Sequence, residues 1–197
     1  MTVQLHCFGE SGNAYKAALT LELAGINWAP VFVDFFGGQM RSDAYRELNI
    51  MAEAPVLIDG DFKLSQSGAI QQWAVDQSGR LGGVPEDKYE VLRWILFDNH
   101  KMSSQAGVTR FLLNFLPESK RPHEAIKFMQ SRMIGALKTL NTHLEGRTWL
   151  VGKDMTIADI ANCGYLFYPE PYGFVRTDWP HIDGWLKRIE TTHGWKH

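Results

Sequence analysis

The chain has 197 residues, of which 45% are hydrophobic and 21% are charged, and its formal net charge is −2. This length is enough for one large domain or two small ones with a substantial core, and the near-neutral charge argues against a nucleic-acid partner. We expect no membrane segment, because no apolar run approaches the ~20 residues that a spanning helix needs, and the chain start lacks the features of a signal peptide. Cys7 and Cys163 are too far apart in the sequence to suggest a disulfide framework or a metal site, so we expect a cytoplasmic protein without a metal.

The first part of the chain alternates between strand-like and helix-like segments. Val3–Phe8 alternates apolar and less apolar side chains, which predicts a strand. Asn13–Ala24 carries apolar side chains at helical spacing, and Gly25 is typical of a helix end. Val31–Phe35 predicts a second strand. A strand, a helix and a strand in this order predict a right-handed crossover between two parallel strands.

Two more helices and a hairpin complete this half. A short helix is expected over Asp43–Leu48. The apolar runs Val56–Ile58 and Phe62–Leu64 flank Asp59-Gly60, a dipeptide typical of a tight hairpin turn. Ser67–Gln77 then predicts a helix with one apolar face. The order of elements is that of an α/β sandwich with one sheet.

The second half contains no convincing strand. Lys88–Met102 is apolar nearly all round, which predicts a helix buried on several sides. Apolar side chains recur at helical spacing from Ile126 to Leu144, and Gly146 is expected to cap that helix. Thr156-Ile-Ala-Asp159 is a capping-box pattern, in which each of the two polar side chains bonds a backbone amide near the other. A final helix is expected from Pro180.

These patterns predict two domains of different texture. An α/β domain is expected over residues 1–78, followed by a linker over 79–87 and an all-α domain over 88–197.

Ala54-Pro55 and Gln66-Ser67 are placed to bind an extended ligand. Pro55 stands directly before a strand, where a cis Ala54-Pro55 bond would leave the backbone of Ala54 free to bond a ligand, although an ordinary trans proline is the commoner case. Gln66-Ser67 opens a helix, so free amides and a hydroxyl gather at its positive end. This arrangement is suited to the carboxylate of a small peptide.

The same segments carry a family resemblance. Ala54-Pro-Val-Leu-Ile-Asp-Gly60 followed by Leu64-Ser-Gln-Ser-Gly-Ala-Ile70 resembles the glutathione-site signature of cytosolic glutathione transferases. Ser11-Gly-Asn-Ala-Tyr-Lys16 resembles the active-site turn of their serine-type members, near the zeta, theta and related bacterial classes. Thr156-Ile-Ala-Asp159 resembles the capping box of their helical domain. The resemblance spans nearly the whole chain and implies a thioredoxin-like N-terminal domain that binds glutathione, followed by an all-α domain that supplies much of the second-substrate pocket.

The resemblance also implies a role for each matching residue. Ala54, beside Pro55, would bond the cysteinyl part of glutathione through its backbone, and Gln66 and Ser67 would hold the γ-glutamyl end. Ser11 would stabilise the thiolate as the catalytic hydroxyl.

From the residues alone, Ser11 has a second reading. It stands directly before the expected helix. Its role there could be limited to that of an N-cap. Asn13 is a candidate for a second polar contact to the ligand.

Two residues depart from the family pattern at the glycyl end of the site. Glu53 occupies a place often held by lysine or glutamine, and its charge would repel the glycyl carboxylate. Met40 stands where many relatives have a histidine. Lys16 or Arg41 is a candidate to compensate for the charge of Glu53.

Other residues with chemical potential are weaker candidates. Cys7 lies inside a predicted strand, which favours buried packing over a reactive thiolate. Asp98-Asn99-His100 could face the cleft or form a contact between helices. A cluster of aromatic residues could wall an apolar pocket or belong to the core: Tyr165, Phe167, Tyr168, Tyr172 and Phe174.

The sequence therefore predicts a glutathione transferase in which the glutathione thiolate attacks a small hydrophobic electrophile. Isomerisation, dehalogenation or peroxide reduction with glutathione would use the same site. A non-catalytic glutathione-transferase-like binding module is the alternative from a different class, favoured by Glu53 and Met40. The resemblance implies a homodimer, with Trp94 or Phe97 as candidates for the buried contact.

Overall fold

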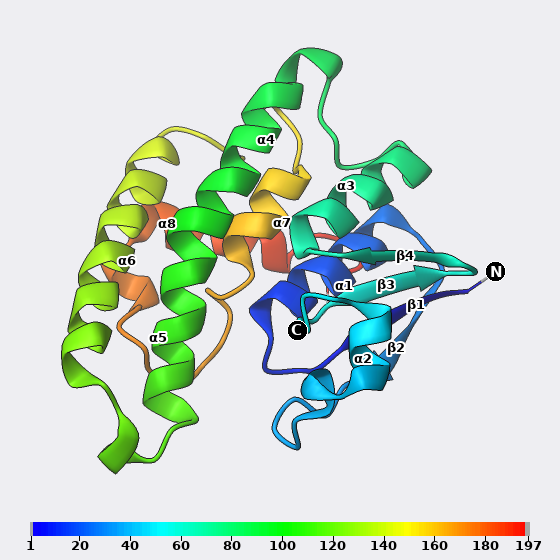
Figure 1. Cartoon of the computed structure of the whole chain (residues 1–197). Helices are drawn as coiled ribbons and strands as arrows, with labels where there is room; N and C mark the ends of the chain where they lie inside the picture. Colours follow the sequence, from blue (N-terminus) through cyan, green and yellow to red (C-terminus); the bar gives the residue numbers. More distant parts are fainter. Residues whose placement is uncertain (1, 196–197) are drawn as a thin grey trace.

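A computed structural model describes residues 2–195 and places a four-stranded sheet with its helices beside an all-helical half (Figure 1). The sheet begins with β1 (Val3–Cys7), which α1 (Gly12–Ala24) connects to β2 (Trp28–Phe32). β1 and β2 are parallel, with Val3 opposite Trp28, so the predicted crossover is confirmed. β2 starts three residues before the predicted Val31 and ends at Phe32. The segment around Pro30 can be a strand because β2 is at the edge of the sheet, where a missing N–H is tolerated.

The rest of the sheet is a hairpin. α2 (Asp43–Leu48) precedes β3 (Val56–Asp59) and β4 (Phe62–Ser65), and α3 (Ser67–Ser78) follows. The strand order is β2-β1-β3-β4, and β3 runs antiparallel to both of its neighbours. The turn uses Gly60 at φ 61°, a conformation that glycine adopts without steric cost. The Ala54-Pro55 bond is cis.

Helices cover both faces of the sheet. On one face, Leu5 and Leu57 pack against Leu21 of α1 and Ile70 of α3 in a fully buried cluster. On the other face, Tyr45 of α2 packs with smaller apolar side chains of the sheet and its loops. This arrangement confirms the predicted thioredoxin-like order of elements.

The second half begins with a continuous helical run that extends beyond the predicted helix. α4 (Lys88–Phe97) passes through a π-helical segment (Asp98–Ser103) directly into α5 (Ser104–Asn114). The prediction that this helix ends at Met102 was therefore wrong, and α5 was missed. Ser103, Ser104 and Gly107 have low helix propensity, but α5 gains tertiary contacts. Gly107 permits one of them, because an added Cβ there would lie 2.8 Å from the Tyr165 ring.

Within residues 2–195, three further α-helices follow: α6 (His123–His143), α7 (Ile157–Cys163) and α8 (Pro180–Glu190). Short 3₁₀ turns lie at Gln39–Arg41, Pro85–Asp87, Glu118–Lys120 and Arg176–Asp178. The C-cap of α6 is Leu144 and not the predicted Gly146, which lies two residues further on with φ 70°. In the part of the chain that the structure describes, the second half has no strand, as predicted.

The predicted capping box starts α7. The Thr156 amide donates to Asp159 Oδ2 at 2.9 Å, and Thr156 Oγ1 accepts from the Ala158 amide at 3.2 Å. Asp159 is fully buried, and its other oxygen accepts from Trp185 Nε1 at 2.9 Å. The capping box thereby joins α7 to α8.

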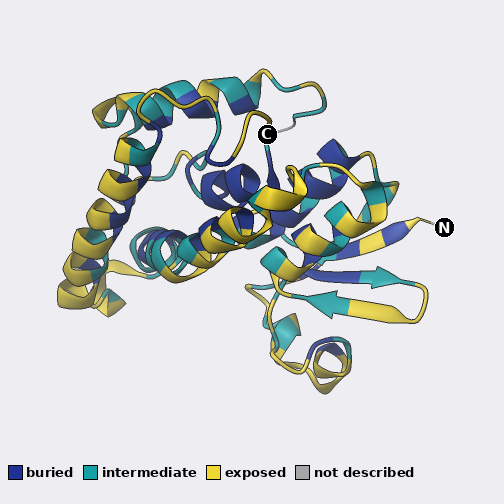
Figure 2. Cartoon of the chain, turned by 90° about the horizontal axis from the view of Figure 1, so that it is seen from above, coloured by how far each residue is buried: buried dark blue, intermediate teal, exposed yellow. Residues whose placement is uncertain are grey.

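The core of the helical half lies where its helices meet (Figure 2). Leu137 of α6, Trp185 of α8 and Trp94 of α4 all belong to it, and Trp94 is only 4% exposed. The suggestion that Trp94 buries a dimer contact was wrong, because its side chain is used inside the monomer.

α3 ends at Ser78 and α4 begins at Lys88, so the proposed linker 79–87 falls between these helices. The division into domains 1–78 and 88–197 stays a proposal, and residues 196–197 lie outside the described residues.

Candidate functional site

A groove of about 430 Å³ lies between the two halves. It contains six of the seven predicted site residues: Asn13, Glu53, Ala54, Pro55, Gln66 and Ser67. The other lining residues are Phe8, Phe35, Met40, Asn99 and Val108. The loop that precedes β3 and the start of α3 therefore meet the end of β1 and the start of α1, as the sequence motifs predicted.

Two backbone features leave hydrogen-bonding groups without backbone or cap partners on one side of this groove. α3 starts at Ser67 and has no side-chain cap, so its first amides have no partner from the N-cap residue Gln66. Among residues 2–195, the amide and carbonyl of Ala54 form no hydrogen bond with other backbone groups. A peptide-like ligand can bond both features.

Asn13 contributes an oriented amide group. Its Oδ1 accepts from Ser67 Oγ at 3.4 Å and from Lys16 Nζ at 3.3 Å. Because both neighbours donate to Oδ1, the orientation of the Asn13 side-chain amide is defined. Its NH₂ group is then left to donate to other acceptors.

Lys16 is part of a buried ion pair. Its Nζ donates to Asp98 Oδ2 at 2.5 Å and also to Ser103 Oγ, and the side chain is only 1% exposed. Burial raises the pKa of Asp98, while the neighbouring Lys16 charge and the Ser103 hydrogen bond lower it. The suggestion that Lys16 compensates for Glu53 was therefore wrong, because its charge is already paired inside the protein.

Ser11 stands just behind the groove. Its Oγ accepts from the Ala14 amide at 3.1 Å, so it is the N-cap of α1, and it is 8% exposed. Its neighbours Phe8 and Asn13 line the groove, whereas Ser11 does not. The N-cap bond uses one acceptor position of the hydroxyl and leaves its proton free to donate. The two readings of Ser11 are therefore compatible.

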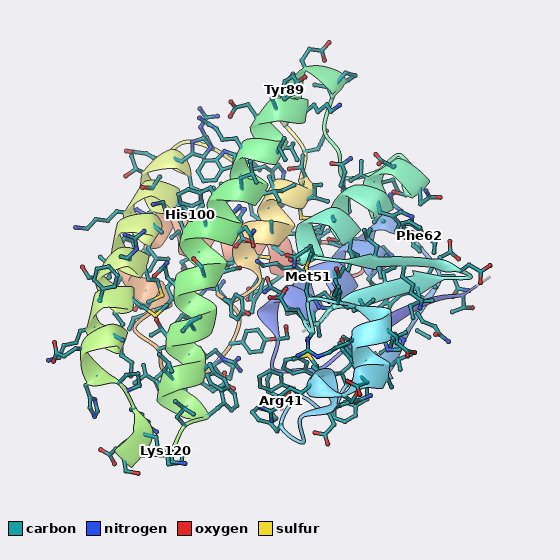
Figure 3. The ribbon with its side chains drawn as sticks, viewed as in Figure 1. Arg41, Met51, Phe62, Tyr89, His100 and Lys120 are labelled. Atoms are coloured by element: carbon teal, nitrogen blue, oxygen red, sulfur yellow. The ribbon has the colours of Figure 1, made fainter. Side chains whose placement is uncertain are left out.

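The surroundings of Glu53 differ from the sequence expectation. Glu53 Oε2 accepts from Gln66 Nε2 at 2.8 Å, so the two predicted ligand residues bond each other. Arg41 is exposed on the turn after β2 and, within residues 2–195, forms no ion pair (Figure 3). Met40 lines the groove.

Two matches with known families decide the identity of the chain. Residues 1–76 match the model described as Glutathione S-transferase, N-terminal domain, and residues 108–192 match Glutathione S-transferase, C-terminal domain. The chain belongs to the glutathione S-transferase family. The match confirms the family, the fold class and the enzyme class that the sequence motifs indicated.

Several members of this family and one longer protein are similar over most of the chain. Glutathione S-transferase F10 of Arabidopsis thaliana is 26% identical over 193 residues, which cover 92% of this chain and 89% of that protein. A glutathione S-transferase structure from Pseudomonas fluorescens aligns with TM-score 0.92 and 29% identity over 100% of this chain and 98% of that one. Elongation factor 1-gamma 3 of Oryza sativa subsp. japonica is 28% identical over 93% of this chain, which spans only 45% of that protein.

The structure gives the remaining sequence candidates different surroundings. Asn99 lines the glutathione S-transferase groove, Asp98 is buried against Lys16, and His100 is exposed (Figure 3). Cys7 packs against the core between sheet and helices, and burial raises the pKa of its thiol, which disfavours a reactive thiolate. Cys7 does not line the groove.

Sequence reasoning missed an aromatic wall on the other side of the groove. The rings of Phe8 and Phe35 stack with centroids 4.7 Å apart, and Phe111 of α5 lies edge-on to Phe35 at 6.0 Å. Phe36 and Phe115 continue the cluster at 5.3 Å. This wall was hidden because α5 was not predicted. The density of phenylalanines at Phe35-Phe36 was the available signal.

No group of three or more histidine, cysteine, aspartate or glutamate side chains that could hold a metal is found among the described residues. Among these residues, no helix combines the length and apolar character required to cross a bilayer.

Proposed function

We propose that the protein is a glutathione transferase that activates the glutathione thiol for attack on a small hydrophobic electrophile. One observation carries the proposal: the free backbone of Ala54 and the uncapped start of α3 face the same groove. These are donors and acceptors in the pattern that a short acidic peptide requires.

The γ-glutamyl end of glutathione would bind at the start of α3. Its carboxylate would accept from the first amides of the helix, at the positive end of the helix dipole. It would also accept from the Ser67 hydroxyl, whose single proton would then leave Asn13 Oδ1. Ala54, fixed by the buried Pro55, would bond the cysteinyl backbone through its amide and carbonyl. Gln66 would add a contact to the γ-glutamyl end after its hydrogen bond to Glu53 opens or rearranges.

The thiolate would lie between Phe8 and Asn13, in front of Ser11. A cysteine-like thiol has a pKa of about 8.5. A hydrogen bond to a charged group contributes ~1.5–3 kcal/mol and a helix N-terminus ~0.3–1 kcal/mol, and about 1.4 kcal/mol changes a pKa by one. Together these interactions would lower the thiol pKa to about 6 or 7, which gives a large thiolate fraction at neutral pH. The Ser11 hydroxyl would supply the hydrogen bond, and the first turn of α1 would supply the helix N-terminus.

The electrophile would bind against the aromatic wall of Phe8 and Phe35, with Val108 of α5 opposite. These side chains offer apolar area and no charge, which favours a small hydrophobic molecule. Placing an apolar electrophile within reach of the thiolate is the entropic part of the catalysis.

Two variants test the thiolate assignment. Ser11→Ala should lower kcat by roughly tenfold or more with little effect on glutathione binding, because it removes a contact to the reacting thiolate. Asn13→Ala serves as the comparison, since Asn13 lines the same groove. Unchanged turnover in Ser11→Ala together with a large loss in Asn13→Ala would move the catalytic role to Asn13.

A non-catalytic binding module is the second candidate, favoured by the Glu53–Gln66 hydrogen bond and by the relative named as an elongation factor 1-gamma. Isothermal titration calorimetry separates the two classes. A binding module that does not use glutathione would give no heat at millimolar glutathione.

A homodimer is part of the same proposal, with a different surface from the one expected. Leu92 and Leu96 of α4 are 46% and 58% exposed, and Phe62 of β4 is 46% exposed. A second cavity of about 350 Å³ lies between α3 and α4 and is lined in part by these two leucines. Phe97 is half-buried and packs against the core of the helical half. The finer serine-type subclass and the cytoplasmic location also remain proposals.

A further inference from the structure

The turn that leads to Ser11 is held at every carbonyl. The Phe8 carbonyl accepts from the Ser11 amide at 3.2 Å, and the Ser11 carbonyl accepts from the Tyr15 amide at 2.9 Å. These two bonds belong to the turn and to the first turn of α1. The Gly9 and Glu10 carbonyls between them have no such local partner, and both are bonded from the helical half.

Arg110 of α5 bonds the Glu10 carbonyl through Nη1 at 2.7 Å, although its side chain is only 3% exposed. Its Nε and Nη2 atoms bond the two carboxylate oxygens of Glu170 at 2.9 and 2.7 Å. These bonds hold the pKa of Glu170 below its usual value, so the pair is ionised at neutral pH. A bidentate pair fixes the guanidinium plane, and the plane then fixes the direction of Nη1.

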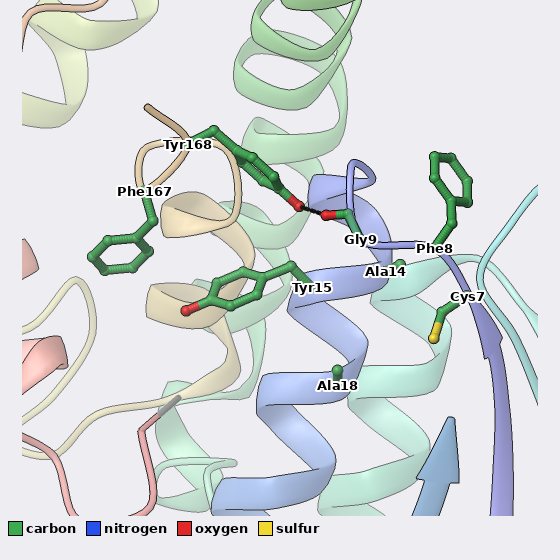
Figure 4. A pocket seen from close by; sticks show the side chains of 8 residues that line it. All are labelled: Cys7, Phe8, Gly9, Ala14, Tyr15, Ala18, Phe167 and Tyr168. Carbon is green, nitrogen blue, oxygen red and sulfur yellow. Dashed lines mark hydrogen bonds between the residues drawn. The ribbon is translucent and has the colours of Figure 1, made fainter. Parts of the chain in front are cut away.

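Tyr168 bonds the other carbonyl. Its hydroxyl donates to the Gly9 carbonyl at 2.7 Å (Figure 4). The Arg110 guanidinium lies 3.9 Å from the centre of the Tyr168 ring. Burial raises the pKa of Tyr168, so the hydroxyl keeps its proton and stays a donor over the working pH range. Arg110 and Tyr168 therefore contact each other and together donate hydrogen bonds to two consecutive backbone carbonyls, those of Gly9 and Glu10.

We propose that Arg110 and Tyr168 are positioning residues that clamp the Phe8–Ser11 turn from the helical half and set the position of the Ser11 hydroxyl. The inference rests on the proposed function, because a precise position matters only where Ser11 meets a thiolate. Neither residue lines the glutathione groove, and Tyr168 lines a separate cavity beside Phe8 and Gly9. The contact of each residue with the turn is its hydrogen bond to a backbone carbonyl, so we infer that both act on Ser11 through the turn. The clamp makes the geometry of the thiolate site depend on how the two halves pack.

Tyr168→Phe is the sharpest test, because it removes the bond to Gly9 and keeps the ring beside Arg110. Tyr89→Phe is the matched control, since Tyr89 is 77% exposed at the start of α4. Steady-state kinetics with glutathione and 1-chloro-2,4-dinitrobenzene should show kcat reduced about tenfold in Tyr168→Phe, with KM for glutathione within twofold of the wild type. The acid limb of the kcat–pH profile should move to higher pH, because the thiolate is less stabilised. Arg110→Lys should behave in the same direction, since lysine cannot bond Glu170 and Glu10 in the same plane.

A double variant and hydrogen exchange separate the clamp from the proposed function. In the Ser11→Ala background, Tyr168→Phe should have less than a twofold further effect, because the clamp acts through Ser11. In the free protein, the Ala14 and Tyr15 amides should exchange faster in Tyr168→Phe than in the wild type and in Tyr89→Phe. Wild-type kinetics and wild-type exchange in Tyr168→Phe would overturn the clamp. Wild-type turnover in Ser11→Ala would overturn the role of Ser11, and the exchange result would still decide whether the turn is clamped.

Discussion

Replacing Lys16 by methionine removes the positive partner of a buried carboxylate and nearly preserves the length of the side chain. Lys16 is 1% exposed and Asp98 is 4% exposed, and their charged atoms are 2.5 Å apart. In the variant, Asp98 would keep its hydrogen bond from Ser103 Oγ at 2.9 Å but lose its counterion. Asn13 would lose one of the two donors that fix its amide.

The expected cost follows from the burial of both partners. Removing one member of a buried pair costs about 3–5 kcal/mol, because an uncompensated charge remains in the interior. Such a loss is a large fraction of the ~5–15 kcal/mol that stabilises a folded protein. Asp98→Asn in the same background removes that charge and should restore about half of the loss or more.

The cost should depend on pH in a defined direction. Burial already raises the pKa of Asp98, and the nearby Lys16 charge opposes that rise. Without Lys16, the folded-state pKa rises further above the unfolded-state value, so the folded state binds the extra proton. The free energy of unfolding of Lys16→Met should therefore be closest to that of the wild type near pH 4. It should fall further behind as the pH rises toward 7.

Urea unfolding followed by circular dichroism at several pH values measures both effects. We expect Lys16→Met and Asp98→Asn to be non-additive, with the double variant more stable than the sum of the two losses by about 1.5 kcal/mol or more. Additive losses within about 0.5 kcal/mol, or a deficit that shrinks as the pH rises, would refute the buried ion pair.

Two further substitutions test separate parts of the account. Asp159→Asn should lower the free energy of unfolding by about 2–4 kcal/mol, because its NH₂ group must face amides that now donate to the carboxylate. Thermal unfolding measures this loss, and a change below about 0.5 kcal/mol would contradict the prediction. Leu96→Glu should convert the proposed dimer to a monomer in analytical ultracentrifugation, because a charge would enter its apolar contact. Val175→Glu, at a position 53% exposed elsewhere on the surface, should leave the dimer intact, and an unchanged dimer in Leu96→Glu would place the contact on another face.

Local signals in the sequence were enough to predict most of the fold. The hairpin at Asp59-Gly60 and the capping box at Thr156–Asp159 each depend on residues within four positions of one another. The start of α3 at Ser67 followed from similar punctuation. These features are stabilised mainly by contacts that the local sequence itself supplies.

Features that depend on distant residues were not predictable in the same way. Lys16 reads as a surface charge until Asp98, 82 positions later, is placed beside it. α5 has a weak helical pattern of its own, and its buried Arg110 is satisfied by Glu170, 60 positions later. The Glu53–Gln66 hydrogen bond joins two segments whose separate roles were predicted but whose contact was not.

In the candidate site, too, some features follow from the local sequence and others depend on distant residues. The family resemblance predicted that Ala54, Pro55, Gln66 and Ser67 belong to one site, and the structure brings all four to one groove. The aromatic wall at Phe35 and Phe111 and the clamp on the Phe8–Ser11 turn come from the packing of the two halves. Sequence patterns describe each half but not how the halves fit.

Glutathione binding in this groove is the claim on which the account depends, and isothermal titration calorimetry with the Ser67→Ala variant tests it most directly. The wild type should bind one glutathione per chain, and Ser67→Ala should bind at least fivefold more weakly, because the γ-glutamyl carboxylate loses a hydroxyl donor. Ser78→Ala is the matched control, since Ser78 lies at the other end of α3 and bonds the Ala74 carbonyl. No heat at millimolar glutathione, or equal affinities in the wild type and Ser67→Ala, would contradict the account.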